Sequence, residues 1–373
     1  MRPANILHLG VKELRSLSRD PILVFLIFFS FTFSVYTSAT AQPETLHKAP
    51  IAIVDEDRSP LSARIADAFY LPYFLPPEFI SQKEMDTRMD NGLDTFALDI
   101  PTGFQRDVLA GRSPALQLNV DATRMNQAFT GSGYIQSIVT GEVNAFVRRY
   151  RAADAPQVDL ALRARFNPGL NKSWFGAVME VINSITMLSL VLTGAALIRE
   201  REHGTVEHLL VMPVTPFEIM SSKVWSMALV VLVAAALSLT FVVQGLLKVP
   251  IEGSIALFLA GAALHLFATT SMGIFLATNT RTMPQFALLL MLILMPLQIL
   301  SGAMTPRESM PQVVQYLMLT MPTTHFVALA QAILYRGAGL SVVWPHFVAL
   351  MLIGTVFFSV SLARFRKAIG TMA

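Results

Sequence analysis

Residues 21–40 read PILVFLIFFSFTFSVYTSAT, an apolar stretch of twenty positions without a charged side chain. A hydrocarbon layer about 30 Å thick is crossed by roughly 20 residues of α-helix. This stretch therefore predicts a transmembrane helix. Five later apolar blocks are long enough for the same role, and we place them at Trp174–Ile198, Val224–Leu247, Ile255–Thr278, Pro284–Ala303 and Val342–Leu362.

The composition also favours a membrane protein. Of the 373 residues, 53% are hydrophobic and 14% are charged, whereas soluble domains average roughly 25% charged residues. Residues 43–172 differ, because they mix polar and apolar residues as an ordinary soluble domain does. The predicted fold class is an α-helical integral membrane protein with six transmembrane helices and an α/β domain inserted between helices 1 and 2.

The expected parts follow the apolar blocks. In order they are an amphipathic N-terminal helix at 1–20, the first span at 21–41, the α/β domain at 43–172, a five-helix membrane region at 174–363 and a tail at 364–373. A cleaved signal peptide is the alternative for the first block, since Ala39-Thr40-Ala41 resembles an A-x-A cleavage site. Apolar cores of signal peptides run about 7–15 residues, so the length favours an uncleaved anchor.

Basic residues near the ends of the spans predict the orientation, because cytoplasmic loops are enriched in lysine and arginine. One side collects Arg2, Lys12, Arg15, Arg19, Arg199, Arg201, Lys223, Arg281, Arg364, Arg366 and Lys367. The short loops on the opposite side contain Lys248, Arg307 and Arg336. Both termini are therefore expected in the cytoplasm, with residues 43–172 outside. The apolar side of the N-terminal helix is expected to consist of Leu7, Val11, Leu14 and Leu17.

Within residues 43–172, strand and helix patterns alternate, which favours an α/β domain. Strands are predicted at Pro50–Val54, Thr95–Ile100 and Leu116–Val120, and helices at Pro60–Phe69, from a Thr102 cap to Leu109, and from about Asn126 to Arg151. Asp55 and Asp57 follow the first strand, where a metal or ligand is one interpretation. A solvated turn is the better one, since no further ligands stand at a recognisable spacing.

The loop after the second span carries the most distinctive pattern. It reads IREREHGTVEHLLVMP over residues 198–213, and Thr215-Pro216-Phe217-Glu218 then predicts a capping box that starts the next helix. A short helix held here between two spans suits the transmission of force from a cytoplasmic partner, although an ordinary charged connector is the alternative. No metal site is expected, because His203 and His208 are five residues apart and do not share a helix face.

These motifs resemble those of one family. Glu200-Arg201-Glu202, Gly204-Thr205-Val206-Glu207, Leu209-Leu210, Pro213 and Glu218 are similar to the coupling loop of ABC-2 type export permeases. Ser301-Gly302, Thr305-Pro306, Met310-Pro311 and Met321-Pro322-Thr323-Thr324-His325 resemble the last outer loop of that family. The anchor span, large outer domain and five further spans match its drug-efflux subgroup over essentially the whole chain. Met304 departs mildly, since a bulkier residue is common there.

The resemblance implies a role for each motif. The residues coupling the permease to an ATPase would be Glu200, Arg201, Glu202, Gly204, Thr205, Glu207, Leu209, Leu210, Pro213 and Glu218, in a loop at 199–223. The outer gate would be a helical hairpin at 304–341, marked by Gly302, Pro306, Pro311, Pro322 and His325. The chain would export hydrophobic or amphipathic small molecules, drug-like or lipid-like, across a bacterial inner membrane.

The energy source is expected on another chain. No G-x-x-x-x-G-K-[ST] motif occurs, so no ATPase site and no bound cofactor are expected here. The resemblance implies an ABC nucleotide-binding subunit that holds ATP and Mg, and pairing with a second copy or a sister permease. A periplasmic adaptor and membrane lipids are further expected partners. The net charge of +3 gives no reason to expect nucleic acid, and the absence of cysteine excludes disulfides.

Two other functions stay open as alternatives. A secondary transporter usually needs ionisable groups inside its spans, and these spans offer Glu180 and His265. Glu180 and Asn183 lie about one turn apart and are candidates for the transport path, while a place at the headgroup level is an equal alternative for Glu180. A membrane-anchored sensor would need a cytoplasmic output domain, for which the tail after Leu362 is too short.

Overall fold

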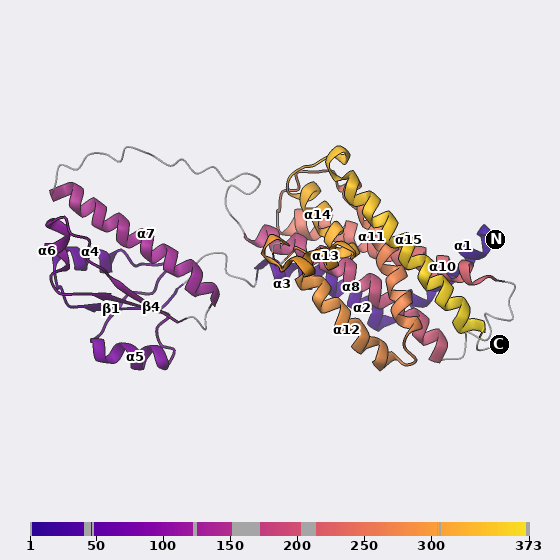
Figure 1. Cartoon of the computed structure of the whole chain (residues 1–373), viewed down its shortest axis with the longest axis horizontal. Coiled ribbons are helices and arrows are strands. Elements are labelled where there is room, and N and C mark those ends of the chain that lie inside the picture. The colour runs from indigo at the N-terminus through magenta and orange to yellow at the C-terminus, as the bar shows by residue number, and fades with distance from the viewer. Residues whose placement is uncertain are drawn as a thin grey trace. The chain divides into compact units, whose positions relative to one another are not determined.

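The computed structural model describes residues 2–40, 46, 48–121, 125–150, 172–202, 214–303, 305 and 307–370. The chain divides into two compact units, one of Met1–Gln42 with Ala164–Ala373 and one of Pro43–Arg163. The first unit is helical, and the second contains a small sheet (Figure 1).

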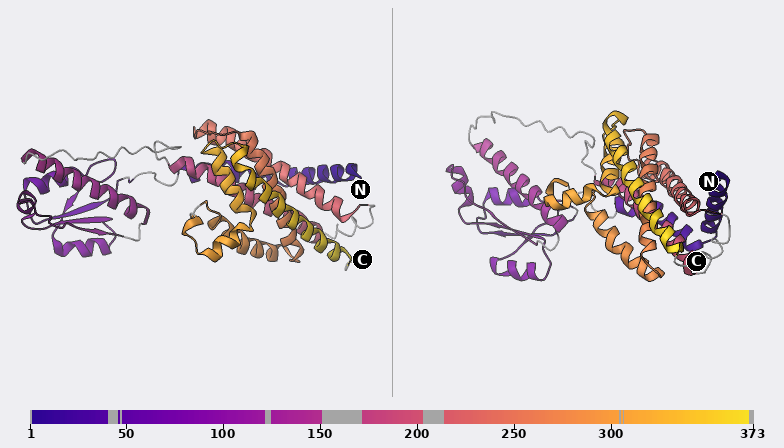
Figure 2. Two further views of the ribbon diagram at one scale, coloured as in Figure 1. Left: turned by 45° about the horizontal axis from the view of Figure 1, so that its top comes forward. Right: turned by 45° about the vertical axis from the view of Figure 1, so that its right-hand side comes forward.

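The helical unit starts with α1 (Pro3–Ser18) and continues through α2 (Pro21–Phe29), η1 (Ser30–Ser34) and α3 (Val35–Thr40). Its later elements are α8 (Lys172–Glu202), α10 (Pro216–Leu237), η2 (Ser238–Leu246), α11 (Ile255–Thr278), α12 (Met283–Ile299), η3 (Arg307–Ser309), α13 (Gln312–Leu319), α14 (Pro322–Leu334) and α15 (Leu340–Gly370). The segments η1 and η2 are π-helical, whereas η3 is a single 3₁₀ turn. Among the described residues, α1 and the C-terminal end of α15 lie at the same end of the unit (Figure 2).

The described helices support five to six membrane spans. Five are long and apolar enough, namely Pro21–Thr40, Trp174–Glu202, Pro216–Leu246, Ile255–Thr278 and Leu340–Lys367. The sixth candidate is the pair of α13 and α14, which is bent by 86°. A full-length span at 284–303 is not confirmed, because α12 has 17 residues, about 26 Å at 1.5 Å per residue, and ends at Ile299.

The central helix of this unit is α8, which packs against α3, α10, α11 and α12. Close packing relies on small residues, because a Cβ atom at Gly194 would lie 1.9 Å from the ring of Phe286 in α12. Hydroxyls also bind backbone carbonyls between helices. Ser184 donates to Ser30 at 3.3 Å, and Ser238 donates to Phe31 at 2.6 Å. Small residues and interhelical hydrogen bonds are the usual means by which helices associate in lipid.

The second unit is built on a four-stranded mixed sheet in the order β2-β1-β3-β4. The strands are β1 (Ile51–Asp55), β2 (Glu78–Phe79), β3 (Phe96–Ile100) and β4 (Gln117–Val120), and only β3 and β4 pair antiparallel. The helices are α4 (Pro60–Asp67), α5 (Gln82–Asp90), α6 (Phe104–Leu109) and α7 (Met125–Tyr150). Helices α4 and α7 lie over one face of the sheet and α5 over the other (Figure 1).

The sequence predicted this unit well except in two places. It missed β2 and α5, since β2 has two exposed residues and α5 is strongly polar. It also placed the cap of α6 at Thr102, whereas the capping residue is Gly103 with φ of 75°. The turn interpretation of Asp55 and Asp57 agrees with their contacts. Asp55 accepts from the Arg58 N–H at 2.8 Å, and Asp57 accepts from the Gln105 N–H at 3.0 Å.

Candidate functional site

Four predicted coupling residues lie in the described helices that flank the loop. Glu200, Arg201 and Glu202 end α8, and Glu218 lies in the first turn of α10. The predicted capping box is confirmed, since the Glu218 N–H donates to Thr215 Oγ1 at 3.3 Å and the Thr215 N–H donates to Glu218 Oε2 at 2.8 Å. The other predicted coupling residues lie outside the described residues, namely Gly204, Thr205, Glu207, Leu209, Leu210 and Pro213.

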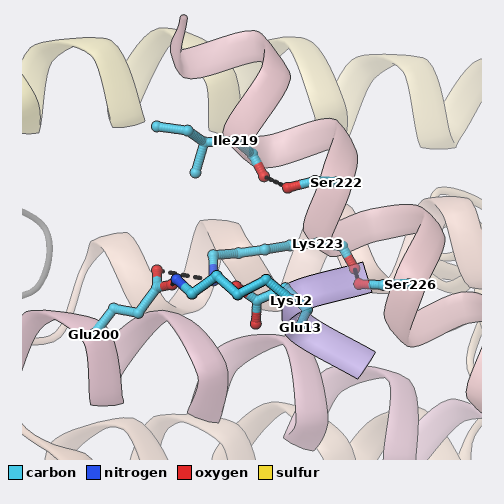
Figure 3. Close-up of polar contacts among 7 residues, drawn as sticks. All are labelled: Lys12, Glu13, Glu200, Ile219, Ser222, Lys223 and Ser226. Carbon is cyan, nitrogen blue, oxygen red and sulfur yellow. Dashed lines mark hydrogen bonds and ion pairs between the residues drawn. The ribbon is translucent and has the colours of Figure 1, made fainter. Parts of the chain in front are cut away.

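An ionic cluster joins α1, α8 and α10 at this end of the helical unit (Figure 3). We call Lys12, Glu13, Glu200 and Lys223 the loop-side cluster. Lys223 Nζ lies 3.0 Å from Glu13 Oε1 and 2.8 Å from Glu200 Oε2. Lys12 Nζ lies 3.4 Å from Glu200 Oε1, at the more exposed edge. Two ammonium groups therefore face two carboxylates, and the cluster is neutral as a whole.

The buried position of Lys223 requires that its charge be paired within this cluster. Lys223 is only 1% exposed, and removing an ammonium group from water costs several kcal/mol unless carboxylates at hydrogen-bonding distance offset the loss. Its serine neighbours do not supply that compensation, because Ser222 and Ser226 donate to the backbone carbonyls of Ile219 and Lys223 (Figure 3). The charge of Lys223 is thus satisfied by carboxylates from two other helices, which holds the three helices together.

Helix α1 is docked on α10 by close packing as well as charge. A Cβ atom at Gly10 would lie 2.0 Å from the indole ring of Trp225, so only glycine permits this approach. The Trp225 Nε1–H donates to the carbonyl of Ile6 at 3.2 Å. The Arg2 backbone N–H donates to Glu218 Oε1 at 2.7 Å.

The docked face of α1 agrees in part with the predicted apolar side. Leu17 is buried and Val11 and Leu14 are half-buried, as predicted, whereas Leu7 is 57% exposed. The other buried residues of α1 are Gly10 and Glu13, which the periodicity of apolar residues did not reveal because they form a glycine contact and an ion pair. Glu13 was not singled out, since its partner Lys223 lies 210 positions away.

The four residues that end α8 each bind a different part of the helical unit. Arg199 Nη1 lies 2.6 Å from Asp20 Oδ2, just before α2. Glu200 binds Lys223 in α10, as described above. Arg201 donates to the carbonyl of Thr280, after α11, at 2.6 Å, and Glu202 accepts from the Met283 N–H, at the start of α12, at 2.9 Å. The end of α8 is therefore a hub that is bound to four other parts of the helical unit.

The candidate path residues lie towards the other end of α8. Glu180 is half-buried and accepts a hydrogen bond from the Ser34 hydroxyl in η1 at 2.5 Å. Asn183, one turn further along, is also half-buried. His265 in α11 lies 2.9 Å from Thr186 Oγ1 and stacks on Phe326 with centroids 4.1 Å apart. Glu180 and His265 thus have different partners, an arrangement that gives a proton relay no support.

The predicted outer hairpin contains α13 and α14, and the bend between them is closed by His325. Its Nε2 atom lies 2.9 Å from the carbonyl of Leu319. Pro311 immediately precedes α13, Pro322 is the first residue of α14, and Gly302 adopts φ of 94° in the preceding turn. The first α-helix of the hairpin begins at Gln312, after the 3₁₀ turn η3, and Pro306 lies outside the described residues.

The described residues contain no group of three or more histidine, cysteine, aspartate or glutamate side chains arranged for a metal ion. His203 and His208 lie outside that part of the chain. The features that stand out are instead the spans, the charged hub that flanks one loop and the bent hairpin. They define a multi-pass membrane protein whose loop contacts are suited to transport.

The chain belongs to the ABC-2 family of transporter proteins, whose pattern matches residues 21–363. It is 66% identical over 369 residues to the inner membrane transport permease YhhJ of Escherichia coli (strain K12), with 99% of each chain covered. It is 27% identical over 361 residues to the probable multidrug ABC transporter permease YbhR of the same strain, with 96% of this chain and 97% of the relative covered. The chain is therefore a membrane transport subunit.

Proposed function

We propose that this chain is the permease of an ATP-driven exporter that moves hydrophobic or amphipathic small molecules out across a bacterial inner membrane. ATP and Mg would be held by a separate nucleotide-binding subunit docked on the loop at 199–223, and two permease chains would enclose the path. Family membership supports the class of complex. Two relatives that are named probable multidrug ABC transporter permeases support the class of cargo.

The observation that carries this proposal is the hub at the end of α8. A partner that pushes on the loop would act on α8 through Glu200 and on α10 through Glu218. Because Lys223 joins both helices to α1, the three helices would move as one body. Helix α1 would then extend the surface on which the ATPase docks.

A secondary transporter is the alternative, and the energy source separates the two. Inverted membrane vesicles containing the permease and its ATPase are supplied with ATP and a fluorescent apolar drug, with and without a protonophore. We expect uptake to continue with the protonophore and to stop when the catalytic glutamate of the ATPase is replaced. Uptake that vanishes with the protonophore while ATP hydrolysis continues would favour the secondary transporter.

The docking site is tested by reversing one charge in the loop. We expect Glu207→Lys to abolish most export and to weaken co-purification of the ATPase, because the reversal adds repulsion or removes a paired carboxylate at the interface. Glu56→Lys, an equal reversal at an exposed position of the sheet unit, is the matched control and should export normally. Normal export by Glu207→Lys would reduce the loop to a connector.

A further inference from the structure

A cavity of about 550 Å³ lies beside the bent hairpin, within the range of roughly 300–1,000 Å³ usual for small-molecule sites. We call it the hairpin-side cavity. Its walls come from the start of α8, the turn after α12, η3, α13, α14 and the start of α15. The lining residues with polar side chains are Ser301, Arg307, Thr324, His325, Gln331, Arg336 and His346.

The charge lining this cavity is of one sign. Arg307 and Arg336 line it together with two histidines, and no aspartate or glutamate is among the described lining residues. Neither guanidinium has an acidic partner within the part of the chain that the structure describes. Arginine presents a planar fork of donors that matches carboxylate and phosphate oxygens. The cavity therefore has the donors of an oxyanion site, and its described lining residues supply no anion to occupy them.

A buried hydroxyl adds to this donor set. Thr324 is 6% exposed, and its Oγ1 atom has no hydrogen-bond partner among the described residues. A buried hydroxyl without a partner destabilises the fold, and a hydrogen bond to a ligand atom in the cavity would offset that cost. Ser301 and Gln331 provide further polar groups in the same walls.

The two histidines do not favour a metal ion in this position. His325 Nε2 lies 2.9 Å from the Leu319 carbonyl, so in the neutral ring this nitrogen is the donor and Nδ1 is an acceptor. His346 Nδ1 lies 3.3 Å from that Nδ1 atom and completes the contact as its donor. The pair is thus satisfied internally, and two neighbouring guanidinium groups repel a cation.

The remaining walls are apolar, formed by Phe175, Ala303, Leu319, Val327 and Ala328. An inorganic anion would leave these walls in contact with water, whereas an acid group attached to a hydrocarbon would cover them. We propose that the hairpin-side cavity binds the acidic phosphate or carboxylate group of an anionic amphiphile, held by Arg307 and Arg336. The amphiphile is either a lipid of the surrounding membrane or a transported molecule, and the second source rests on the proposed function.

Binding is tested on the purified full-length chain in a neutral detergent by native mass spectrometry. The probes are dioleoylphosphatidylglycerol, whose headgroup carries an anionic phosphate, and dioleoylglycerol, which has the same hydrocarbon chains and no acid group. We expect the anionic lipid to bind at least about ten-fold more tightly, because only its phosphate can accept charged hydrogen bonds from the two arginines. Equal binding of the two lipids by the unmodified chain would overturn the proposal.

Variants assign the binding to this cavity. Arg307→Gln with Arg336→Gln should remove the preference, and Arg307→Lys with Arg336→Lys should keep part of it, since the charge stays and the fork is lost. Lys248→Gln is the matched control, because Lys248 is an exposed basic residue of a short loop that does not line the cavity. An equal loss in Lys248→Gln would show attraction by surface charge alone and would contradict the site. Binding of Zn²⁺ that requires His325 and His346, without a preference for the anionic lipid, would also contradict it.

The source of the amphiphile is decided in reconstituted vesicles containing the ATPase. If membrane lipid occupies the cavity, the Gln double variant should export a neutral drug without the stimulation that phosphatidylglycerol gives the unmodified chain. If cargo occupies it, the variant should lose export of dodecyl phosphate and keep export of the neutral drug. An ATPase that neither binds nor drives transport would refute the proposed function, yet the binding result on the isolated chain would be unaffected.

Discussion

The two ends of the helical unit differ in how their charged side chains are paired. In the loop-side cluster, Lys223 lies within 3.0 Å of two carboxylates and the charges cancel. In the hairpin-side cavity, Arg307 and Arg336 face a hollow space without an acid among the described lining residues. Phe175 lines the cavity and Glu200 belongs to the cluster, and both lie on α8. They are 25 positions apart, which corresponds to about 38 Å of helix, so one helix joins the two ends.

This difference separates contacts that hold helices together from contacts suited to a ligand. Neutralised buried charges have no capacity left for a further partner, and they fix the positions of the helices that carry them. Unpaired cations around a cavity have that capacity and do little for the stability of the fold. An exporter of the proposed kind needs both kinds of contact, because the ATPase would act on one end of the unit and cargo or lipid would bind at the other.

The largest effect expected is the all-or-none labelling that tells which end faces the cytoplasm. The chain has no cysteine, so single cysteines at Ser59, Ser113 and Thr371 can be probed with an impermeant thiol reagent on spheroplasts. We expect Ser59→Cys and Ser113→Cys to be labelled and Thr371→Cys to be protected, because the distribution of basic residues predicts that both termini lie inside. The reverse pattern would place the loop-side cluster outside and exclude an ATPase docked there.

The next largest effect is expected for Lys223→Met. Removing the ammonium takes away the buried cation that Glu13 and Glu200 share, while Lys12 still faces Glu200 at the exposed edge. Losing one member of a buried ion pair costs about 3–5 kcal/mol of unfolding free energy. Unfolding in mixed micelles with increasing SDS, followed by tryptophan fluorescence, measures the loss. Trp225 reports on α1 directly through its contact with Gly10.

Lys12→Met is the matched control for that variant. Its ammonium lies 3.4 Å from Glu200, and its side chain is 54% exposed, so the expected loss is roughly 0–1 kcal/mol. Equal losses of unfolding free energy in the two variants would show that burial does not determine how much each ion pair of the cluster contributes. The distinction between the two ends of the helical unit would then lose its basis.

A smaller effect is expected at Glu180, which lies on α8 between the two ends. Glu180→Gln removes the negative charge and keeps an oxygen that accepts from Ser34, so the contact with η1 should persist. If Glu180 lines the transport path, export of a cationic drug should fall a few-fold while ATP hydrolysis continues. Initial rates of export and of ATP hydrolysis, measured together, check this outcome. An unchanged export rate would limit Glu180 to packing η1 against α8.

How far the sequence predicted these features depends on how local their signals are. The capping box at Thr215 and the five long spans were predictable, because hydrophobic length and capping patterns lie within one element. The pairing of Glu13 with Lys223 was not, since nothing in either segment specifies a partner 210 positions away. We counted Lys223 among the basic residues that predict orientation, and a lysine near a loop is usually exposed to solvent. In the structure Lys223 is buried instead.

The hairpin shows the same limit. The resemblance assigned Pro311 and Pro322 to the predicted hairpin, and both lie at helix starts. It gave no indication that Arg307 and Arg336 line one cavity with His325 and His346, because that juxtaposition depends on the bend between α13 and α14. Arg307 and Arg336 are two of the three basic residues that we counted on the opposite side for topology. Their position around one cavity becomes evident only from the structure.

The smallest effect on stability is expected for the two arginines of the hairpin-side cavity, which have no acidic partner among the described residues. Without lipid, Arg307→Gln with Arg336→Gln should leave the free energy of unfolding unchanged or slightly raised, because two like charges are removed and no carboxylate loses a described partner. The same SDS titration used for Lys223→Met measures it in neutral detergent. Added phosphatidylglycerol should then stabilise the unmodified chain and not the variant, since a ligand stabilises the folded state only where it binds. A loss of several kcal/mol without lipid would mean that the arginines hold the hairpin in place, and the two ends of the unit would then use charge in the same way.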